Sequence, residues 1–289
     1  MLRLALLDMN AGVPNQGMRC LRRIAAAFRR DFAADVFDVR AGGELPDASY
    51  DVYLFSGGPG TPLATGEAWE APFFTLLDGL WEHNRATADP AYRKYCFFIC
   101  HSFQLAVRHF GLGDITARRS MSFGTFPVHR SAEGEGDVLF LGLDEVFYVA
   151  DFREYQVTRA NPSAMTAIGA EVLAYEKVRP HVPYERAVMA IRFSGEWVGT
   201  QFHPEADAEG MTLHFEDPAR RAVVIDEHGP AKYAEMMRDL ADPRRIGRTN
   251  EVVIPNFLRR ARHKLQARLA RPGSQGDGAV GERAARRAA

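Results

Sequence analysis

Cysteine is scarce in this chain, and its spacing excludes a disulfide framework. The 289 residues include three cysteines, Cys20, Cys96 and Cys100. Their number is odd and no two form a CxxC pair, whereas disulfide-rich secreted domains carry even sets at regular spacing. We therefore expect free thiols in a reducing compartment. Because the histidines also lack the ligand spacing of a zinc site, we expect no metal and no cofactor.

Long apolar runs and an excess of charge of one sign are missing as well. No run reaches the roughly 18 apolar residues that a transmembrane helix needs. The apolar stretch at the N-terminus is too short for a signal peptide and has no small-residue cleavage site. The net charge is −1 and the pI is about 6.8, so the whole molecule has no strong attraction to nucleic acid or to an anionic membrane. We expect a cytoplasmic protein that binds neither.

Strand and helix patterns alternate through the first 111 residues. With 46 % hydrophobic residues the chain has enough apolar material for one large α/β domain. We expect strands at 2–9, 34–40, 50–58 and 95–100, with helices at 18–32, 67–86 and 101–111 between and after them. Strands separated by helices at this spacing are typical of a parallel sheet with crossover helices.

The second half of the chain has a different pattern. We expect strands of a meander or hairpin layer at 119–131, 136–143 and 145–151, and a hairpin from 186–193 and 196–205. Two amphipathic helices are expected at 229–240 and around 257–269. We therefore divide the chain into a core domain at 1–206, a helical extension packed on it at 207–270, and a disordered tail at 271–289.

Cys100 stands where the period of the sequence changes. The strand "YCFFIC" ends on it and the amphipathic segment "HSFQLAVRHFG" follows. A sharp strand-to-helix turn lies at the carboxyl edge of a parallel sheet, where doubly wound folds bind ligands, and the helix N-terminus favours a thiolate. The residues alone also allow a plain buried cysteine, which is our interpretation of Cys96.

Two further segments carry groups that a cysteine nucleophile needs. In "GTQFHPEAD" the extended spacing places His203 and Glu205 on the same side, so that a carboxylate can orient an imidazole. The glycines of "SGGPG", at 56–60, can present backbone N–H groups to an oxyanion. Taken separately, each segment also fits an ordinary surface turn.

The order of "SGGPG", "CHSFQ" and "QFHPE" resembles the glutaminase domain of class I, or triad, glutamine amidotransferases over residues 2–206. The resemblance implies a three-layer α/β/α, doubly wound, mostly parallel sheet of the flavodoxin-like type. It also implies a role for each matched residue. Cys100 would be the nucleophile, His203 the general base and acid, Glu205 its orienting partner, Gly57, Gly58 and the N–H of His101 the oxyanion loop, and Gln104 a glutamine-binding residue.

The chain departs from the family pattern at two places. Phe98 and Ser102 stand at the usual glycine positions around the family's nucleophile; Ser102 is small enough to be tolerated there, and Phe98 is the larger departure. Phe152 and Arg153 stand where the family has a Ser-His pair that supports the substrate. Arg153 and Tyr155 are therefore candidates to face a different amide or acyl substrate, and they fit a solvated strand end equally well.

The resemblance implies an enzyme that releases ammonia from glutamine through a thioester, using a Cys-His-Glu triad. The chain has no P-loop pattern and is too short to include an ATP-dependent synthetase, so we expect a partner synthetase subunit that accepts the ammonia. The extension helices would pack on the core, form a homodimer contact or dock that partner. Two alternatives remain open: another cysteine-elbow hydrolase or acyltransferase of this fold, and a non-catalytic regulatory relative.

Overall fold

The computed structural model describes residues 1–179 and 185–269, so the tail expected at 271–289 lies outside the described residues. The strands are β1 (Leu2–Asp8), β2 (Phe32–Asp38), β3 (Val52–Phe55), β4 (Tyr95–Ile99), β5 (Asp114–Arg130), β6 (Val146–Thr158), β7 (Glu171–Glu176), β8 (Val188–Arg192) and β9 (Trp197–Thr200). The α-helices are α1 (Gln16–Ala27), α2 (Glu70–Ala86), α3 (His101–Phe110), α4 (Ala132–Glu135), α5 (Pro162–Ile168), α6 (Ala208–Glu216), α7 (Pro218–His228), α8 (Pro230–Ala241) and α9 (Ile246–Leu269). Two short 3-10 helices complete the set, η1 (Pro90–Tyr92) and η2 (Val138–Phe140).

The strands described here form one nine-stranded sheet in the order β2-β1-β3-β4-β9-β8-β6-β5-β7. The first five strands in this order pair in parallel. Doubly wound parallel sheets bind their ligands at the carboxyl ends of the strands. The other four pair antiparallel, and β7 also pairs with β8, so these four close into a small barrel. The α/β class is confirmed, but the expectation of a mostly parallel sheet needs correction, because the barrel is antiparallel.

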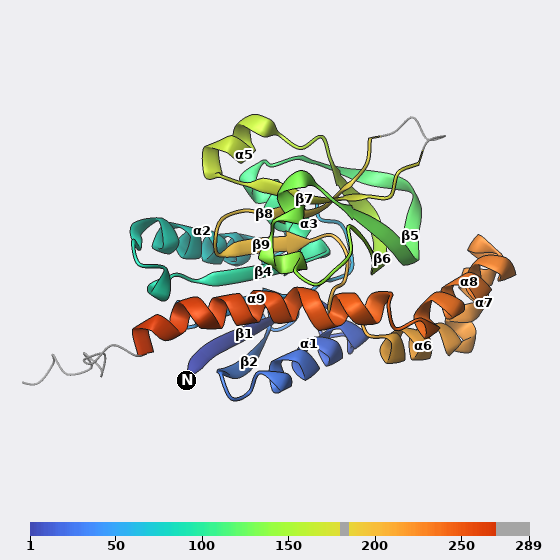
Figure 1. Ribbon diagram of the computed structural model, residues 1–289, viewed down its shortest axis with the longest axis horizontal. Helices are drawn as coiled ribbons and strands as arrows, with labels where there is room; N and C mark the ends of the chain where they lie inside the picture. Colours follow the sequence, from blue (N-terminus) through green and yellow to red (C-terminus); the bar gives the residue numbers. More distant parts are fainter. Residues whose placement is uncertain (180–184, 270–289) are drawn as a thin grey trace, which may run out of the picture.

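Helices cover both faces of the parallel strands (Figure 1). One apolar core joins α1 and α9 to the sheet, and a second joins α2, α3 and α5 to the opposite face. Strand β4 is buried on both faces, because Phe97 and Ile99 lie in the first core while Cys96 and Phe98 lie in the second. This burial explains the continuous apolar run in its sequence. The carboxyl end of β4 therefore opens between two filled layers.

Residues 136–143 do not form the strand that their apolar run predicts. The Asp137 side chain accepts a hydrogen bond from the Leu139 N–H and starts the 3-10 helix η2. Consecutive residues Leu139 and Phe140 are both buried, which an alternating strand does not allow. The Asn256 side chain on α9 donates to carbonyls of this segment in place of a neighbouring strand.

Residues 208–269 form four helices where the sequence pattern predicted two. Helix α9 lies along the parallel part of the sheet, and side chains such as Leu258 and Leu265 are fully buried in the first core (Figure 1). Helices α6, α7 and α8 form a third apolar cluster with Phe123 and Phe152 from the barrel strands. The division into core and extension remains a prediction.

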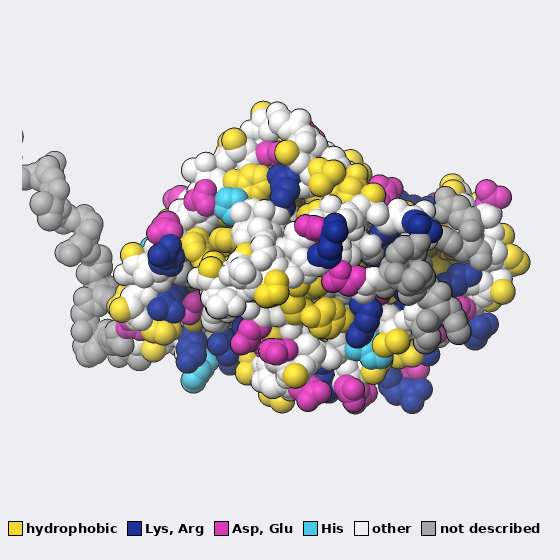
Figure 2. All heavy atoms as spheres, turned by 90° about the horizontal axis from the view of Figure 1, so that it is seen from above, with side chains coloured by type: hydrophobic (Ala, Val, Ile, Leu, Met, Phe, Trp, Pro, Cys, Tyr) yellow, Lys and Arg dark blue, Asp and Glu magenta, His cyan; other side chains and the backbone are white. Residues whose placement is uncertain are grey.

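The surface of the molecule agrees with its small net charge. On the face in Figure 2, Lys and Arg side chains are interspersed with Asp and Glu side chains and with scattered apolar groups. Within residues 1–179 and 185–269, no helix has the length and apolar character needed to cross a membrane.

Candidate active site

Cys100 occupies a strained turn between β4 and α3. Its backbone has φ 50° and ψ −100°, a conformation that costs a non-glycine residue about 1–3 kcal/mol. The Cys100 N–H donates to the Thr200 carbonyl of β9 at 2.8 Å, and the Cys100 carbonyl accepts the first helical bond, from Gln104 N, at 3.0 Å. The residue is 6 % exposed and lines a cleft, so its thiol lies at the bottom of a site rather than within closed packing.

Ser102 stabilises this turn from inside. Its hydroxyl accepts the Ile99 N–H at 2.8 Å and lies 3.0 Å from the Phe55 carbonyl. The side chain is fully buried, so these bonds connect the end of β4 to β3 without access of water. The hydroxyl thus supports the sharp turn at the position where the family carries a small residue.

Phe98 is accommodated by a glycine on the neighbouring strand. Its ring stacks on Phe55 with centroids 4.7 Å apart, in the core on the α2 and α3 side. A Cβ at Gly199 of β9 would lie 3.1 Å from the Phe98 Cβ and 2.8 Å from Phe103. The space that the family provides with a small residue before its nucleophile comes here from Gly199.

His203 and Glu205 follow β9 in an extended segment. The His203 N–H donates to the Ala150 carbonyl at 2.9 Å, which attaches the segment to β6. The imidazole Nδ1 lies 2.7 Å from the Glu205 Oε1, and Glu205 is 1 % exposed. The Asn250 side chain of α9 donates to the Glu205 carbonyl at 2.7 Å, so the extension helps to fix this loop.

The His203 imidazole lies beside the Cys100 side chain in the cleft. Both groups adjoin Gly57, where an added Cβ would lie 2.7 Å from the His203 Cε1 and 3.5 Å from the Cys100 Cβ. Burial alone would lower the pKa of His203, but the Glu205 carboxylate and the Cys100 sulfur raise the pKa well above its usual value. The arrangement therefore favours a protonated imidazole beside the Cys100 sulfur.

Gly57 and Gly58 bring the loop after β3 close to the nucleophile. A Cβ at Gly58 would lie 2.3 Å from the Met9 carbonyl oxygen, so the position admits no side chain. The Asn10 side chain donates to the Gly57 carbonyl at 3.2 Å and holds the loop to the segment after β1. The His101 N–H belongs to the first turn of α3 and has no acceptor within the helix. The loop with Gly57 and Gly58 and the N-terminal end of α3 thus lie on either side of Cys100.

The side chains of His101 and Gln104 turn away from the cleft. His101 is 2 % exposed, and burial lowers its pKa to about 4, so the ring is neutral near pH 7. The Gln104 amide donates at 3.0 Å both to the Tyr155 carbonyl and to the Gln201 side chain. The Gln201 amide in turn lies 3.7 Å from the Cys100 Sγ. Gln104 reaches the nucleophile through Gln201, which the sequence analysis missed although it stands two residues before His203 on the same side of the chain.

Arg153 and Tyr155 are not brought to the Cys100 cleft. The Arg153 side chain is 1 % exposed and pairs with Asp151 at 2.9 Å and with Glu176 at 3.4 Å. Successive strand residues point to opposite faces, so Phe152 faces the nucleophile while Arg153 faces the interior of the barrel. The Phe152 carbonyl lies 3.6 Å from the Cys100 Sγ, and Tyr155 contributes only its carbonyl, to Gln104.

The resulting Cys100 cleft has a volume of about 960 Å³. Its inner wall comes from the loops after β1 and β3 and from Phe152, His203 and Glu205. Its outer wall comes from helices α6 and α7, through residues that include Met211, Leu213, His214 and Arg220. Sequence patterns gave no sign of this wall, because the residues that cover the cleft are not recognisable before the fold places them.

Solved structures of other proteins share this fold. A glutamine amidotransferase from Thermotoga maritima has TM-score 0.66 at 14 % identity, covering 90 % of this chain and 98 % of its own. A glutamine amidotransferase from Methylobacillus flagellatus has TM-score 0.61 at 15 % identity, covering 95 % and 97 %. The glutaminase domain of CTPS from Trypanosoma brucei, with bound acivicin, has TM-score 0.53 at 15 % identity, covering 83 % and 94 %. At these identities the three structures show a shared fold.

A comparison with curated proteins gives no match. The sequence model of the family Glutamine amidotransferase class-I matches residues 24–216, which is more than half of the chain and includes Cys100, His203 and Glu205. The chain therefore belongs to the class I glutamine amidotransferase family.

Proposed function

We propose that this protein hydrolyses the side-chain amide of glutamine, with Cys100 as nucleophile. The observation that carries the proposal is that Cys100 and the hydrogen-bonded His203–Glu205 pair line one cleft, with Cys100 and His203 both adjoining Gly57. A thiol beside a base that is itself oriented by a carboxylate is the arrangement that nucleophilic catalysis requires. The family to which the chain belongs supports glutamine as the substrate.

In the proposed reaction the Cys100 thiolate attacks the carboxamide carbon and forms a carbon–sulfur bond. The N–H groups of Gly58 and His101 stabilise the negative charge on the oxygen. The carbon–nitrogen bond then breaks as His203 gives its proton to the departing ammonia, which leaves a thioester. His203 next takes a proton from water, the hydroxide attacks the thioester, and glutamate leaves as the thiol is restored.

We also propose that the ammonia passes to a synthetase on a partner chain. The described residues form one sheet with its covering helices, and the sequence has no P-loop for ATP. The name of the Trypanosoma brucei neighbour, a glutaminase domain, describes a unit of this kind. Gln104 would support the site indirectly, since its amide holds Gln201 against the sulfur.

A second candidate is a cysteine hydrolase that acts on a larger amide. The cleft of about 960 Å³ is at the upper end of the size range of small-molecule sites, and it extends to Leu213, His214 and Arg220 on the helical wall. Free glutamine would leave that part empty. A γ-glutamyl amide with a bulky group on nitrogen would fill it and undergo the same attack at the same carbon.

The test measures ammonia release from glutamine, and p-nitroaniline release from γ-glutamyl-p-nitroanilide, by the purified full chain. Turnover of glutamine that is lost in Cys100→Ala and kept in Cys96→Ala supports the first candidate. Turnover of the anilide alone supports the second. Absence of both activities, together with no covalent labelling of Cys100 by a glutamine-like chloroketone, contradicts both and leaves a non-catalytic relative.

A further inference from the structure

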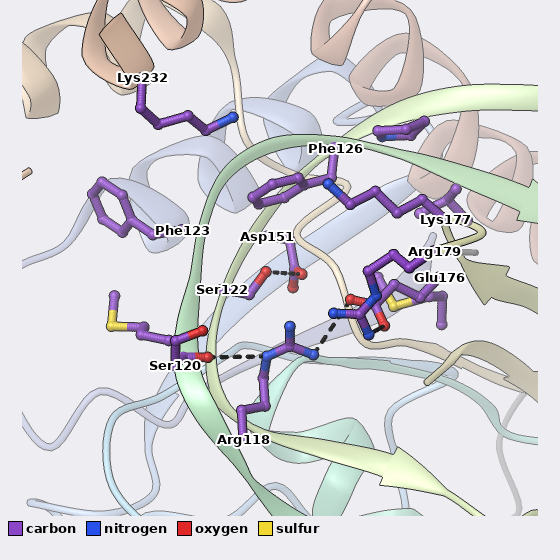
Figure 3. Close-up of a pocket in the computed structure, with 14 residues that line it drawn as sticks. Arg118, Ser120, Ser122, Phe123, Phe126, Asp151, Glu176, Lys177, Arg179 and Lys232 are labelled. Atoms are coloured by element: carbon purple, nitrogen blue, oxygen red, sulfur yellow. Dashed lines mark hydrogen bonds and ion pairs between the residues drawn. The ribbon is translucent and has the colours of Figure 1, made fainter. Parts of the chain in front are cut away.

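A second cavity, of about 400 Å³, opens into the small antiparallel barrel (Figure 3). Residues of β5 form most of its lining, with further side chains from the end of β7, from β6 and from α8. None of its described lining residues belongs to the Cys100 cleft. The two sites lie on opposite sides of β6, since Asp151 lines the barrel cavity and the next residue, Phe152, lines the cleft.

Three arginines surround two carboxylates at the bottom of this barrel cavity. Glu176 accepts from Arg118 at 3.3 Å, from Arg153 at 3.4 Å and from Arg179 at 2.7 Å. Asp151 pairs with Arg153 at 2.9 Å. Figure 3 shows Arg118 of β5 and Arg179, which lies after the end of β7, beside Glu176. The cluster holds more positive than negative charge before any lysine is counted.

Two lysines add positive charge at the mouth of the cavity. The ammonium groups of Lys177 and Lys232 lie 4.9 and 5.3 Å from the centre of the same Phe126 ring. Lys232 pairs with Glu235 at 3.1 Å, whereas no ion pair within the described residues reaches Lys177. Burial, and after it the positive charge of Lys232, lowers the pKa of Lys177, although Glu176 and Glu235 oppose the shift.

Polar atoms without partners lie beside this charge. Asp151 is 2 % exposed, and its Oδ2 is bound by Ser122 at 2.7 Å, but its Oδ1 has no partner among the described residues. The Nη1 of buried Arg153 has none either. Buried polar atoms are normally satisfied, and Asp151 lines the cavity, so its open acceptor indicates a ligand that uses it.

We propose that the barrel cavity binds a small phosphate monoester, with the phosphate between Lys177 and Lys232 and a hydroxyl donating to the Asp151 Oδ1. The five cations of the site face three carboxylates, an excess of two positive charges. A phosphate monoester carries −1.5 to −2 near pH 7 and three strong acceptor oxygens, which suits two ammonium groups. The cavity volume of about 400 Å³ is within the range of small-molecule sites.

Isothermal titration of the full chain with ribose 5-phosphate, glycerol 3-phosphate and AMP tests this proposal, with ribose and citrate as comparison ligands. We expect saturable binding of at least one monoester and none of ribose. Lys177→Gln and Lys232→Gln should each weaken it by about tenfold or more. Lys264→Gln makes the same charge change at an exposed position of α9 and should leave the affinity unchanged.

Three results would overturn the proposal: no saturable binding of any of the three monoesters, binding by both lysine variants as tight as by the unaltered protein, or a preference for citrate over all three. Because Lys177 has a partly buried side chain, Lys177→Arg serves as a second variant that keeps the charge and should retain binding. The measurement does not depend on turnover, so its outcome is independent of whether the protein hydrolyses glutamine.

Discussion

The Nδ1 of His203 lies 2.7 Å from the Oε1 of Glu205, and one residue separates the two in the chain. The other carboxylate oxygen, Oε2, is buried and has no hydrogen-bond partner among the described residues. No ion pair other than the one with His203 is described for Glu205. Among the described residues, the imidazole is therefore the ionic partner of this buried carboxylate.

Replacing Glu205 with Gln should lower both the pKa of His203 and the rate of ammonia release. Burial then acts on the imidazole with only the Cys100 sulfur to oppose it, so the pKa falls. Losing an oriented base should reduce turnover by roughly 10²- to 10⁴-fold. NMR titration of the labelled imidazole and a steady-state ammonia assay measure the two effects. Glu209→Gln, at an exposed position of α6, is the matched control and should change neither.

The same pair should make stability depend on pH in a defined direction. His203 has a raised pKa in the folded protein, so the stabilising contact with Glu205 is complete below the unfolded-state value of about 6.5 and is lost as the pH rises through the folded-state pKa. In a Cys100→Ala background, which removes the sulfur, Glu205→Gln should therefore destabilise the fold more at about pH 6 than at about pH 10. Urea unfolding at both pH values measures this difference. An equal loss in the free energy of unfolding at the two pH values would contradict this prediction.

Replacing Gly57 with Ala should impair catalysis without unfolding the protein. The added methyl group would lie 2.7 Å from the His203 Cε1, so the imidazole must move away from Cys100. A displacement of about 1 Å in a reacting group costs about 10²-fold in rate. The ammonia assay and a thermal melt report the two properties. Gly79→Ala on α2 meets no atom within 4 Å and should leave the rate unchanged, which separates local displacement from a general effect of alanine.

The elements around Cys100 could be predicted because their signals are local. The change from an apolar run to helical spacing marks the turn at Cys100, and the alternation of an extended segment places His203 and Glu205 on one side. Each of these features can be recognised from residues that are neighbours in the sequence. The structure brings the three side chains together, while their catalytic roles remain predictions to be tested by turnover.

Features that depend on distant contacts were not visible in the sequence. Arg153 was a candidate substrate contact, but the pairing of β6 with β5 decides which face of the strand it occupies, and that face is the barrel interior. The segment 136–143, which includes η2, has carbonyls that accept hydrogen bonds from Asn256, more than a hundred residues away. The covering of the cleft by α6 and α7 likewise depends on the third apolar cluster and not on any local pattern.

The three cysteines should differ sharply in reactivity toward an alkylating reagent. Burial raises the pKa of Cys96 well above its usual value, and burial with the nearby Asp207 charge raises the pKa of Cys20 to about 12. A raised pKa keeps a thiol protonated and unreactive near neutral pH. Iodoacetamide should therefore label Cys100 first, as measured by peptide mass spectrometry over time. His203→Ala should slow that labelling, and comparable rates at all three cysteines would contradict the assignment.

Replacing Arg153 with Met should destabilise the protein rather than alter its affinity for glutamine. The guanidinium is 1 % exposed and lies between Asp151 and Glu176, so its removal leaves buried carboxylate charge with less compensation. Breaking a buried ion pair from one side costs about 3–5 kcal/mol of the free energy of unfolding, measured here by urea denaturation. Arg85→Met, whose side chain is 69 % exposed on α2, should cost less than about 0.5 kcal/mol. A variant that keeps its stability but has a raised KM for glutamine would instead indicate that Arg153 contacts the substrate.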